Sequence, residues 1–409
     1  MDIGAIIKAV IWLGLVFLYA FGAGGKVPYF LFYTSLVIFA AGFVWAFINR
    51  RVSALCYTES LSTQVGSKVK FTLEVENRSG WPVPWVQCWV QMPGTFDLPD
   101  NLGCYTFSLK AHEKKVLHEE LECRQRGRFS WGSILVRTGD IFGVFTSSQH
   151  MGEMKQIVVL PKIYDLGDDL GIIYSQGLGL NRGLTRRGRS GSEFMGVRKY
   201  DSGDGISRIH WKASARSQNL LVKEFEENNN YGFIIILDAD EKHHRGSGPD
   251  CSLEKAVTLA ASLAAMGSRN SYGTGIAVSG SQIARVPIGY GKGHFNLILE
   301  TLVGVRTEAG LDCWERFSDS VFTGKRCGTY LITGFIDGNL VDRLIRMKHR
   351  GWEIVVFLLK LESFGGRDIT AENRQKEALR LRGGGISVVM VDRQTDLRLL
   401  FRGLEYGNC

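Results

Sequence analysis

Residues 233–237 read Phe-Ile-Ile-Ile-Leu, an unbroken apolar run that ends at the carboxylate of Asp238. Such a run is typical of a strand that is covered on both faces, as in a parallel sheet. Directly downstream, apolar residues recur at helical spacing from Leu253 to Ala264. The two segments together predict a buried strand followed by a helix that packs on the same sheet.

Further strand and helix candidates alternate towards the C-terminus. Strands are expected at residues 275–278, 330–333, 354–358 and 386–390, and helices around residues 294–302 and 338–348. Alternating strands and helices predict a parallel sheet with helices on both faces, so residues 231–409 are expected to form an α/β domain. Ligands of such folds bind beyond the carboxyl ends of the strands, which points to the segment after Leu237.

Residues 52–161 have a different pattern, which is typical of a β-rich domain. Apolar and polar residues alternate strictly from Lys68 to Glu76, as in a half-buried strand. The Pro-containing stretch 81–85 then interrupts the pattern, because proline cannot donate to a ladder. Further strands are expected at residues 86–92, 105–109, 115–122 and 129–136. Short strands and frequent turns predict a sandwich-like domain with its Trp and Phe side chains in the core.

Residues 1–51 contain two long apolar runs. Residues 3–22 carry one charge, Lys8, and residues 28–48 carry none, so each run is long enough to span a bilayer as a helix. A cleaved signal peptide is the alternative for the first run, but a second span would not follow it at once. Arg50 and Arg51 follow the second run. The positive-inside rule therefore predicts a transmembrane helical hairpin, a multi-pass protein in the cell membrane and a cytoplasmic soluble body.

Residues 162–230 read as a linker with two unusual stretches. The first is rich in glycine and carries the basic residues Arg182, Arg186, Arg187 and Arg189. It is either a solvated mobile loop or a grip for phosphate, lipid or an acidic helix. The second stretch, residues 191–216, mixes acidic, basic and aromatic side chains. Guanidinium groups bind carboxylates in forked pairs and stack on rings, so this stretch is either an internal clamp or a docking surface for a partner.

The second stretch resembles the signature of the bacterial domain-of-unknown-function 58 family. The matching residues are Gly191, Glu193, Phe194, Arg198, Tyr200, Gly203, Asp204, Arg208, Trp211, Ala215 and Arg216. An earlier stretch, from Arg126 to Phe145, resembles the second landmark of that family, with Ile141 where members usually have proline. The two apolar runs match as well, so the resemblance covers nearly the whole chain.

The resemblance implies a von Willebrand factor A-like α/β domain behind a β-rich domain. It also implies a partnership with an AAA+ ATPase of the MoxR type. We expect the partner to bind the signature residues Glu193, Arg198, Tyr200, Asp204, Arg208, Trp211 and Arg216.

A-type domains hold Mg²⁺ through Asp-x-Ser-x-Ser at the end of the first strand, and the resemblance places Asp238 and Asp240 there. Lys242 replaces the second serine and would repel a cation. Gly334 lies where a further metal-site aspartate is common. We therefore expect a degenerate site and no cofactor. His243 and His244 are additional candidate ligands, although a pair of histidines on a polar loop is usually solvated.

Composition and motifs narrow the function classes. The net charge of +8 suits anionic lipid, nucleic acid or an acidic protein face equally well. The eight cysteines include no closely spaced pair, which is typical of buried thiols in a reducing compartment. The sequence contains no phosphate loop, nucleophile elbow, zinc-protease helix or dinucleotide fingerprint.

These patterns favour a membrane-anchored cytoplasmic adaptor that is not itself an enzyme. The alternative is a membrane-surface hydrolase or transferase that acts on envelope precursors, with Glu193 and Asp204 as acid and base. A third interpretation is binding of nucleic acid or lipid through the basic loop, which would weaken steeply with salt, and we expect no nucleic-acid partner.

Overall fold

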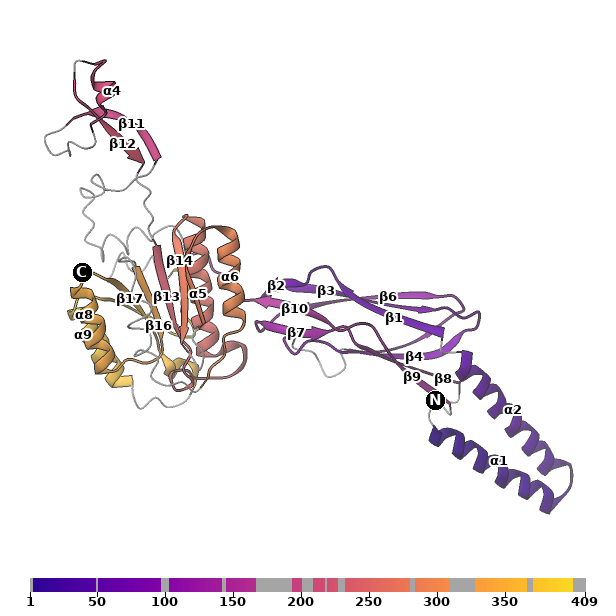
Figure 1. Cartoon of the computed structure of the whole chain (residues 1–409). Coiled ribbons are helices and arrows are strands. Elements are labelled where there is room, and N and C mark those ends of the chain that lie inside the picture. The colour runs from indigo at the N-terminus through magenta and orange to yellow at the C-terminus, as the bar shows by residue number, and fades with distance from the viewer. Residues whose placement is uncertain are drawn as a thin grey trace. The chain divides into compact units, whose positions relative to one another are not determined.

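The structure, a computed structural model, describes eleven segments of the chain. These are residues 3–48, 51–96, 103–141, 145–166, 193–200, 209–217, 219–226, 232–279, 284–308, 328–365 and 371–399. The chain divides into two compact units, Met1–Lys162 and Ile163–Cys409. The first unit holds two apolar helices and a β-rich body, and the second holds an α/β region (Figure 1).

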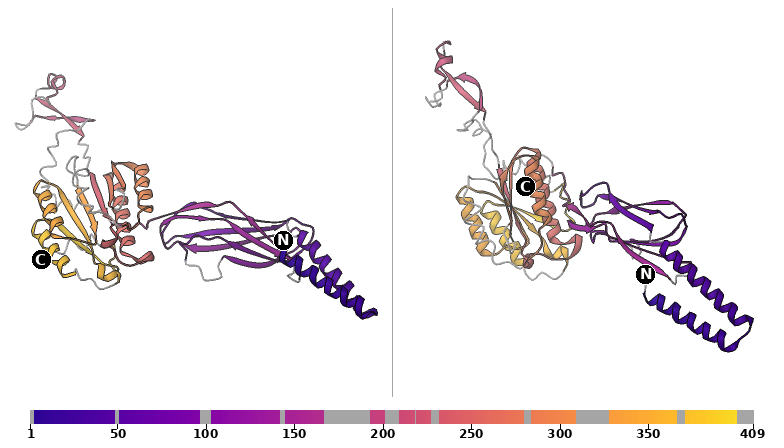
Figure 2. Two further views of the ribbon diagram at one scale, coloured as in Figure 1. Left: turned by 60° about the horizontal axis from the view of Figure 1, so that its bottom comes forward. Right: turned by 45° about the vertical axis from the view of Figure 1, so that its right-hand side comes forward.

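Two helices, α1 (Ile3–Ala23) and α2 (Lys26–Ile48), open the first unit. They run side by side in opposite directions (Figures 1 and 2). The short connection contains Gly24 and Gly25, which both have positive φ angles, 63° and 88°. Both helices are long and apolar enough to cross a membrane by length and composition.

The β-rich body contains three sheets. Their strands are β1 (Val52–Thr58), β2 (Ser62–Gln64), β3 (Lys68–Asn77), β4 (Val83–Val90), β5 (Cys104–Leu109), β6 (Lys114–Glu122), β7 (Gly127–Trp131), β8 (Ile134–Gly139), β9 (Thr146–Met151) and β10 (Lys155–Leu160). The strand orders are β1-β3-β6, β2-β10-β7 and β5-β4-β8-β9. All paired strands are antiparallel except β2 and β10, and side chains from the three sheets share one apolar core.

The alternating stretch is confirmed as a strand, and its apolar residues from Val69 to Val75 are buried in β3. The single strand expected over residues 129–136 is wrong. It is two strands, because Gly132 takes a φ of 101° and turns the chain between β7 and β8. Trp131 is fully buried as expected, whereas Trp81 is exposed, which contradicts the prediction that all these aromatic residues are core.

The α/β region contains a six-stranded sheet in the order β15-β14-β13-β16-β17-β18. The strands are β13 (Gly232–Asp238), β14 (Gly273–Ser279), β15 (Ala284–Gly289), β16 (Gly328–Thr333), β17 (Glu353–Leu359) and β18 (Ser387–Val391). Neighbours are parallel except β15, which is antiparallel to β14. From β13 the chain continues to β14 on one side of it and later to β16 on the other side. The topological switch point of the sheet therefore lies between β13 and β16.

Helices cover both faces of this sheet. They are α5 (Ser252–Arg269), α6 (Gly291–Val303), α8 (Gly338–His349) and α9 (Ala371–Gly383). Figure 1 shows α5 and α6 on one face and α8 and α9 on the other. Ile234 and Ile236 face the core beneath α8 and α9, while Phe233 and Ile235, also buried, alternate with them along β13. The continuous apolar run therefore reflects burial of both faces, as predicted.

A small hairpin precedes the sheet in the chain. Strand β11 (Glu193–Lys199) pairs antiparallel with β12 (Leu221–Glu226), and the single-turn helix α4 (Trp211–Ser214) lies between them in the sequence. The side chain of His210 accepts a hydrogen bond from the backbone of Ala213 (3.2 Å) and so caps α4. Ser214 Oγ accepts a bond from the backbone N–H of Leu221 (2.8 Å) and ties the helix to β12.

Candidate functional site

The carboxyl edge of the sheet at the switch point is organised around Asp238. This residue ends β13, and its side chain is almost fully buried. The hydroxyl of Ser279, which ends β14, donates to Oδ1 over 3.1 Å. The hydroxyl of Thr333, which ends β16, donates to Oδ2 over 2.7 Å. One carboxylate therefore joins the ends of three adjacent strands.

The turn after β13 supplies two further donors to the same carboxylate. The backbone N–H of Asp240 reaches Oδ1 over 3.1 Å, and Nδ1 of His243 lies 2.8 Å from Oδ2. A short 3₁₀ helix, Glu241–His243, brings the imidazole into place, and Asp240 caps it by accepting the N–H of Lys242 (3.0 Å). The His243 ring also stacks on Phe335, with centroids 4.6 Å apart.

His244 fastens this turn to the start of helix α5. Its Nε2 lies 2.7 Å from the carbonyl oxygen of Asp238, so this nitrogen carries the proton and donates. Its Nδ1 then accepts from the hydroxyl of Ser252, 3.0 Å away. Ser252 Oγ in turn accepts the backbone N–H of Arg245 over 2.8 Å. The buried imidazole is thus neutral and has a partner at each nitrogen.

Two pKa values in this cluster are shifted. Burial acts to raise the pKa of Asp238, but the hydrogen bond and charge of His243, with the Thr333 hydroxyl, outweigh it and lower this pKa. Burial lowers the pKa of His244 against the opposing effect of the Asp238 carbonyl and carboxylate. Asp238 is therefore held ionised and His244 is held neutral at pH 7.

Stability of the α/β region is expected to fall as the pH is lowered from 7 towards 5. His244 is neutral when folded, and its lowered pKa means that the unfolded chain binds the proton first, below about pH 6.5. The stability contribution of neutral His244 is present above the unfolded pKa and is lost below it. Thermal unfolding of the full chain in detergent, followed between pH 7 and 5, tests this expectation.

The replacement His244→Gln should flatten that pH dependence, whereas His349→Gln should leave it intact. His349 is exposed at the end of α8 and serves as the matched control. Equal slopes for His244→Gln and the unmodified protein would contradict the assignment.

The donor set around Asp238 does not suit Mg²⁺. A divalent cation needs several oxygen ligands with free lone pairs, but both carboxylate oxygens already accept two hydrogen bonds each. Asp240 is buried and caps the 3₁₀ helix. Within the described segments, no three His, Cys, Asp or Glu side chains come together as metal ligands. His244 is buried and the His243 side chain is only 16% exposed, which corrects the expectation that both are solvated.

The predicted partner-binding residues and the predicted basic loop fall into four groups, the last of which is Trp211 and Arg216. Glu193 and Arg198 lie on β11, but their side chains are outside the described part of the structure. Tyr200 is half-buried beside the end of β11, and its backbone N–H bonds to Leu220. The following residues lie outside the described segments: Asp204, Arg208, Arg182, Arg186, Arg187 and Arg189.

Trp211 and Arg216 are both exposed on the hairpin. Trp211, the first residue of α4, has 63% of its surface accessible. The charged side chains that the structure describes on this hairpin are exposed cations, namely Lys199, Lys212, Arg216 and Lys223. We call Trp211 and these four cations the hairpin surface.

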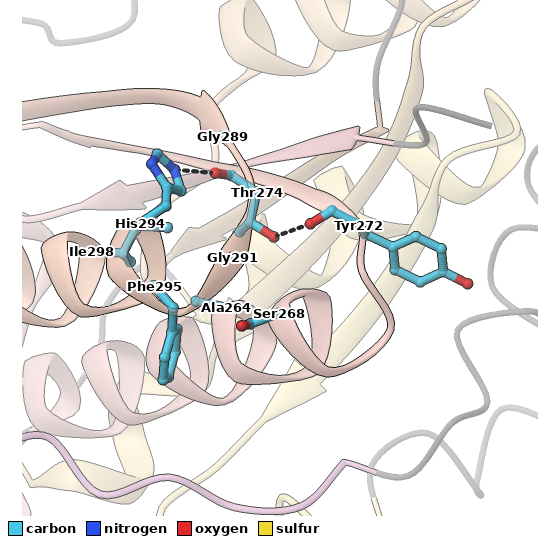
Figure 3. Close-up of a pocket in the computed structure, with 9 residues that line it drawn as sticks. All are labelled: Ala264, Ser268, Tyr272, Thr274, Gly289, Gly291, His294, Phe295 and Ile298. Atoms are coloured by element: carbon cyan, nitrogen blue, oxygen red, sulfur yellow. Dashed lines mark hydrogen bonds between the residues drawn. The ribbon is translucent and has the colours of Figure 1, made fainter. Parts of the chain in front are cut away.

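A shallow recess lies elsewhere, between α5, α6 and the start of β14 (Figure 3). His294 Nε2 lies 2.8 Å from the carbonyl oxygen of Thr274, and the Thr274 hydroxyl donates to the carbonyl of Tyr272 over 3.2 Å. Thr274 is near the amino end of β14, so the recess is at the sheet edge opposite Asp238. Ligands of open α/β sheets bind at the carboxyl edge, so we place no site in this recess.

Sequence reasoning missed three residues of the Asp238 cluster, namely Ser279, Thr333 and Ser252. The available signal was positional. Ser279 follows one predicted strand and Thr333 ends another, at the point where a parallel sheet brings strand ends together.

The fold and this cluster define a class of protein. Its members have two apolar helices of membrane-spanning length, a β-rich body and an α/β region. At the switch point of the α/β region, hydrogen-bond donors of the protein itself occupy the carboxylate of Asp238. A family model described as "Protein of unknown function DUF58" matches residues 196–359, from β11 to the end of β17. A relative is the "Uncharacterized protein YeaD" of Bacillus subtilis (strain 168). It is 23% identical over 386 residues, which cover 92% of this chain and 94% of the relative.

Solved structures show only partial similarity. The CARDB domain of a Pyrococcus furiosus protein is 19% identical over 26% of this chain and 91% of that domain, with a TM-score of 0.20. The PapD-like domain 7 of human CEP192 is 15% identical over 27% of this chain and 88% of that domain, also with a TM-score of 0.20. Scores this low carry no argument about fold or function.

Proposed function

We propose that this chain is a membrane-anchored interaction protein whose soluble body lies in the cytoplasm. The observation that carries the proposal is the saturation of Asp238 at the switch point by Ser279, Thr333, His243 and a backbone N–H. A carboxylate with four donors has no lone pair to spare for a metal or a proton-transfer step. At the place where an α/β fold usually binds its ligand, Asp238 therefore has a structural role and holds the ends of three strands together.

We further propose that the α/β region is a von Willebrand factor A-like domain with a degenerate metal site. Support comes from the acidic residue at the end of the central strand β13 and from the helices on both sheet faces. The backbone of His243 supports the degenerate character, because its carbonyl oxygen lies 2.1 Å from where a Cβ on Gly334 would be. An aspartate ligand at residue 334 would collide with it.

The partner we propose is an AAA+ ATPase of the MoxR type, docked on the hairpin surface. The exposed Trp211 and Arg216 suit a partner face that combines apolar and acidic side chains, since Trp and Arg supply much of the energy at interfaces. The two apolar helices would tether the chain that carries this surface to the membrane. The proposed task is to recruit the ATPase to the membrane.

One observation favours the alternative, a membrane-surface hydrolase or transferase. An imidazole held by a carboxylate, as His243 is by Asp238 over 2.8 Å, is the arrangement of a general base. However, the Ser279 and Thr333 hydroxyls donate to the carboxylate and so serve Asp238, not the imidazole. The adaptor remains the better supported of the two.

Photo-crosslinking in the bacterium that encodes the chain tests the adaptor. A benzophenone amino acid at Trp211 is expected to capture an AAA+ ATPase as its dominant partner, identified by mass spectrometry. The matched control is Leu379 on α9, which is exposed to nearly the same extent, 60% against 63%. Enrichment of the ATPase at residue 211 over residue 379 should be at least about tenfold if a specific interface forms.

Two outcomes would contradict the proposal. Crosslinks from residue 211 that stay within the chain would make the hairpin surface an internal clamp. Equal capture of the ATPase at residues 211 and 379 would mean that no specific docking surface exists. Loss of a membrane activity after His243→Ala, in a protein that still binds the ATPase, would instead favour the hydrolase.

A further inference from the structure

Three loops gather at the end of the β-rich body where α2 leads into β1. Strand registers place them there, because Val52 at the start of β1 pairs with Asn77 at the end of β3. The β3–β4 and β5–β6 loops are tied together by Asn77, whose amide donates to the carbonyls of Trp81 and Lys110, each over 2.8 Å. The β8–β9 loop, which contains Ile141, follows the last residue of β8 at the same end.

Phe145, at the close of the β8–β9 loop, packs into the two apolar helices. Its ring lies 6.2 Å from Phe39 and 6.2 Å from Phe43 of α2, edge to face in both cases. It also packs with Ala9 near the start of α1. Phe145 is 97% removed from solvent, since only 3% of its surface is accessible. Phe145 therefore packs against both helices near one end of the helical pair.

Close backbone approach makes this contact specific. A Cβ on Gly42 would lie 3.0 Å from the Asp140 carboxylate and 3.0 Å from the Phe145 ring, so the helix surface is indented where the loop enters. Asp140 is buried, and its carboxylate accepts the backbone N–H of Phe145 over 3.0 Å. Trp85 Nε1 donates to the Asp140 carbonyl over 2.9 Å. These bonds hold Asp140 and Phe145 in place beside Gly42.

Helix length determines how deep this contact lies. Helix α2 has 23 residues, which is about 34 Å at 1.5 Å per residue. The hydrocarbon core of a bilayer is about 30 Å thick, so α2 has only a few ångströms to spare if it spans the membrane. Phe43 and Phe39 lie five and nine residues before Ile48, or about 8 Å and 13 Å along the helix. Phe145 must then lie below the membrane surface.

The residues around this contact suit a lipid environment. Ile141, four residues before Phe145, is 65% exposed, and Trp81 is 57% exposed although it touches Trp45 of α2 at 6.1 Å between centroids. Tryptophan is enriched at the boundary of headgroups and acyl chains. Transfer of a side chain as exposed as Ile141 from water into the apolar lipid region would lower the free energy.

Among the described residues, the exposed charged side chains at the same loop end are basic. Arg51 and Arg78 are exposed and linked through a backbone bond of 3.0 Å, and Lys110 is exposed on the neighbouring loop. Glu76 pairs with Arg78, and Glu113 accepts the backbone N–H of Lys110, so the acidic groups are engaged locally. Basic side chains around exposed aromatic ones favour the headgroup region of an anionic membrane.

We propose that this loop end, defined by Trp81, Ile141 and Phe145, is inserted into the lipid interface from which α1 and α2 enter the bilayer. The inference rests on the membrane anchoring proposed above and extends it. The β-rich body is not tethered by a free linker. It has its own lipid-binding surface, in which Ile141 contacts acyl chains and Trp81 lies among headgroups.

Lipid photo-crosslinking of the full chain in native membranes tests this proposal. A benzophenone amino acid is placed at Ile141 or at Trp81, and phospholipid adducts are measured by mass spectrometry. Leu61 is the matched control, since it is 57% exposed, like Trp81, but lies between β1 and β2 at the other end of the body. Lipid adducts at residues 141 and 81 are expected to exceed those at residue 61 by at least about tenfold.

Carbonate extraction of the same membranes separates the two proposals. If the chain is released, the membrane anchoring itself is wrong. If the chain stays in the membrane but residues 81 and 141 give no more adducts than residue 61, the anchoring holds and the inserted surface is wrong. Limited proteolysis verifies that each variant is folded. If the variant at residue 141 is misfolded, the comparison of residue 81 with residue 61 decides the test.

Discussion

Replacement of Asp238 by alanine is expected to lower the free energy of unfolding of the α/β region by about 3–5 kcal/mol. The change removes the common acceptor of Ser279, Thr333, His243 and the backbone of Asp240. Each buried donor left without a partner costs about 1–3 kcal/mol, although relaxation of the turn recovers part of that sum. Such a loss is a large fraction of the stability of an ordinary domain.

Urea unfolding of the full chain in detergent measures this loss, with hydrogen exchange of β13 and β16 to locate it. The control is Asp250→Ala, which removes a carboxylate that is 72% exposed and paired only at the surface with Arg393. An exposed pair of this kind contributes about 0–1 kcal/mol. A similar, small loss of unfolding free energy for both variants would show that Asp238 does not hold the strand ends together.

Replacement of Gly334 by aspartate is expected to be almost as damaging, at about 3 kcal/mol or more. A Cβ at this position would lie 2.1 Å from the carbonyl oxygen of His243 and 2.8 Å from Leu361. The backbone of the 3₁₀ turn must move, which takes the His243 imidazole away from Asp238. A second carboxylate near the ionised Asp238 adds repulsion.

Thermal unfolding of Gly334→Asp, compared with Gly338→Asp, checks this expectation. A Cβ on Gly338 meets only the Arg380 guanidinium, at 3.6 Å, and an acidic residue at the first position of α8 suits the helix dipole. The control should therefore stay within about 0.5 kcal/mol of the original protein. Equal stability of the two variants would mean that the 3₁₀ turn at Glu241–His243 moves without a cost in free energy. A higher unfolding temperature of Gly334→Asp in Mg²⁺ would show that the site can be reopened for a cation.

The buried strands were predictable, because the apolar runs of β13, β14, β16, β17 and β18 have no alternative as exposed elements. The bounds of strand β15 could not be predicted, for a physical reason. It is an edge strand that contains Pro287 and alternates irregularly, so its sequence lacks a periodic signal. Helix α9 was missed because charged residues fill most of its surface, with Ala378 and Leu381 among the few apolar residues that it buries.

The Asp238 cluster could be predicted only in part. The resemblance to a family placed Asp238 at the end of the first strand, but its partners lie 41 and 95 residues away in sequence. Which hydroxyls meet the carboxylate depends on strand register, which a single sequence does not specify. His244 looked solvated because polar residues surround it in sequence. It is buried because the Asp238 carbonyl and the Ser252 hydroxyl satisfy both of its nitrogens.

The spacing of those partners has a consequence for synthesis of the chain on the ribosome. Asp238 emerges first, Ser279 follows 41 residues later, and Thr333 follows only after 95 residues. Contacts between such distant residues must close long loops, so they form late in folding. The carboxylate therefore stays only partly paired until β16 has been made. Its last hydrogen bond, from Thr333, forms only when the central strands have been assembled in the correct order.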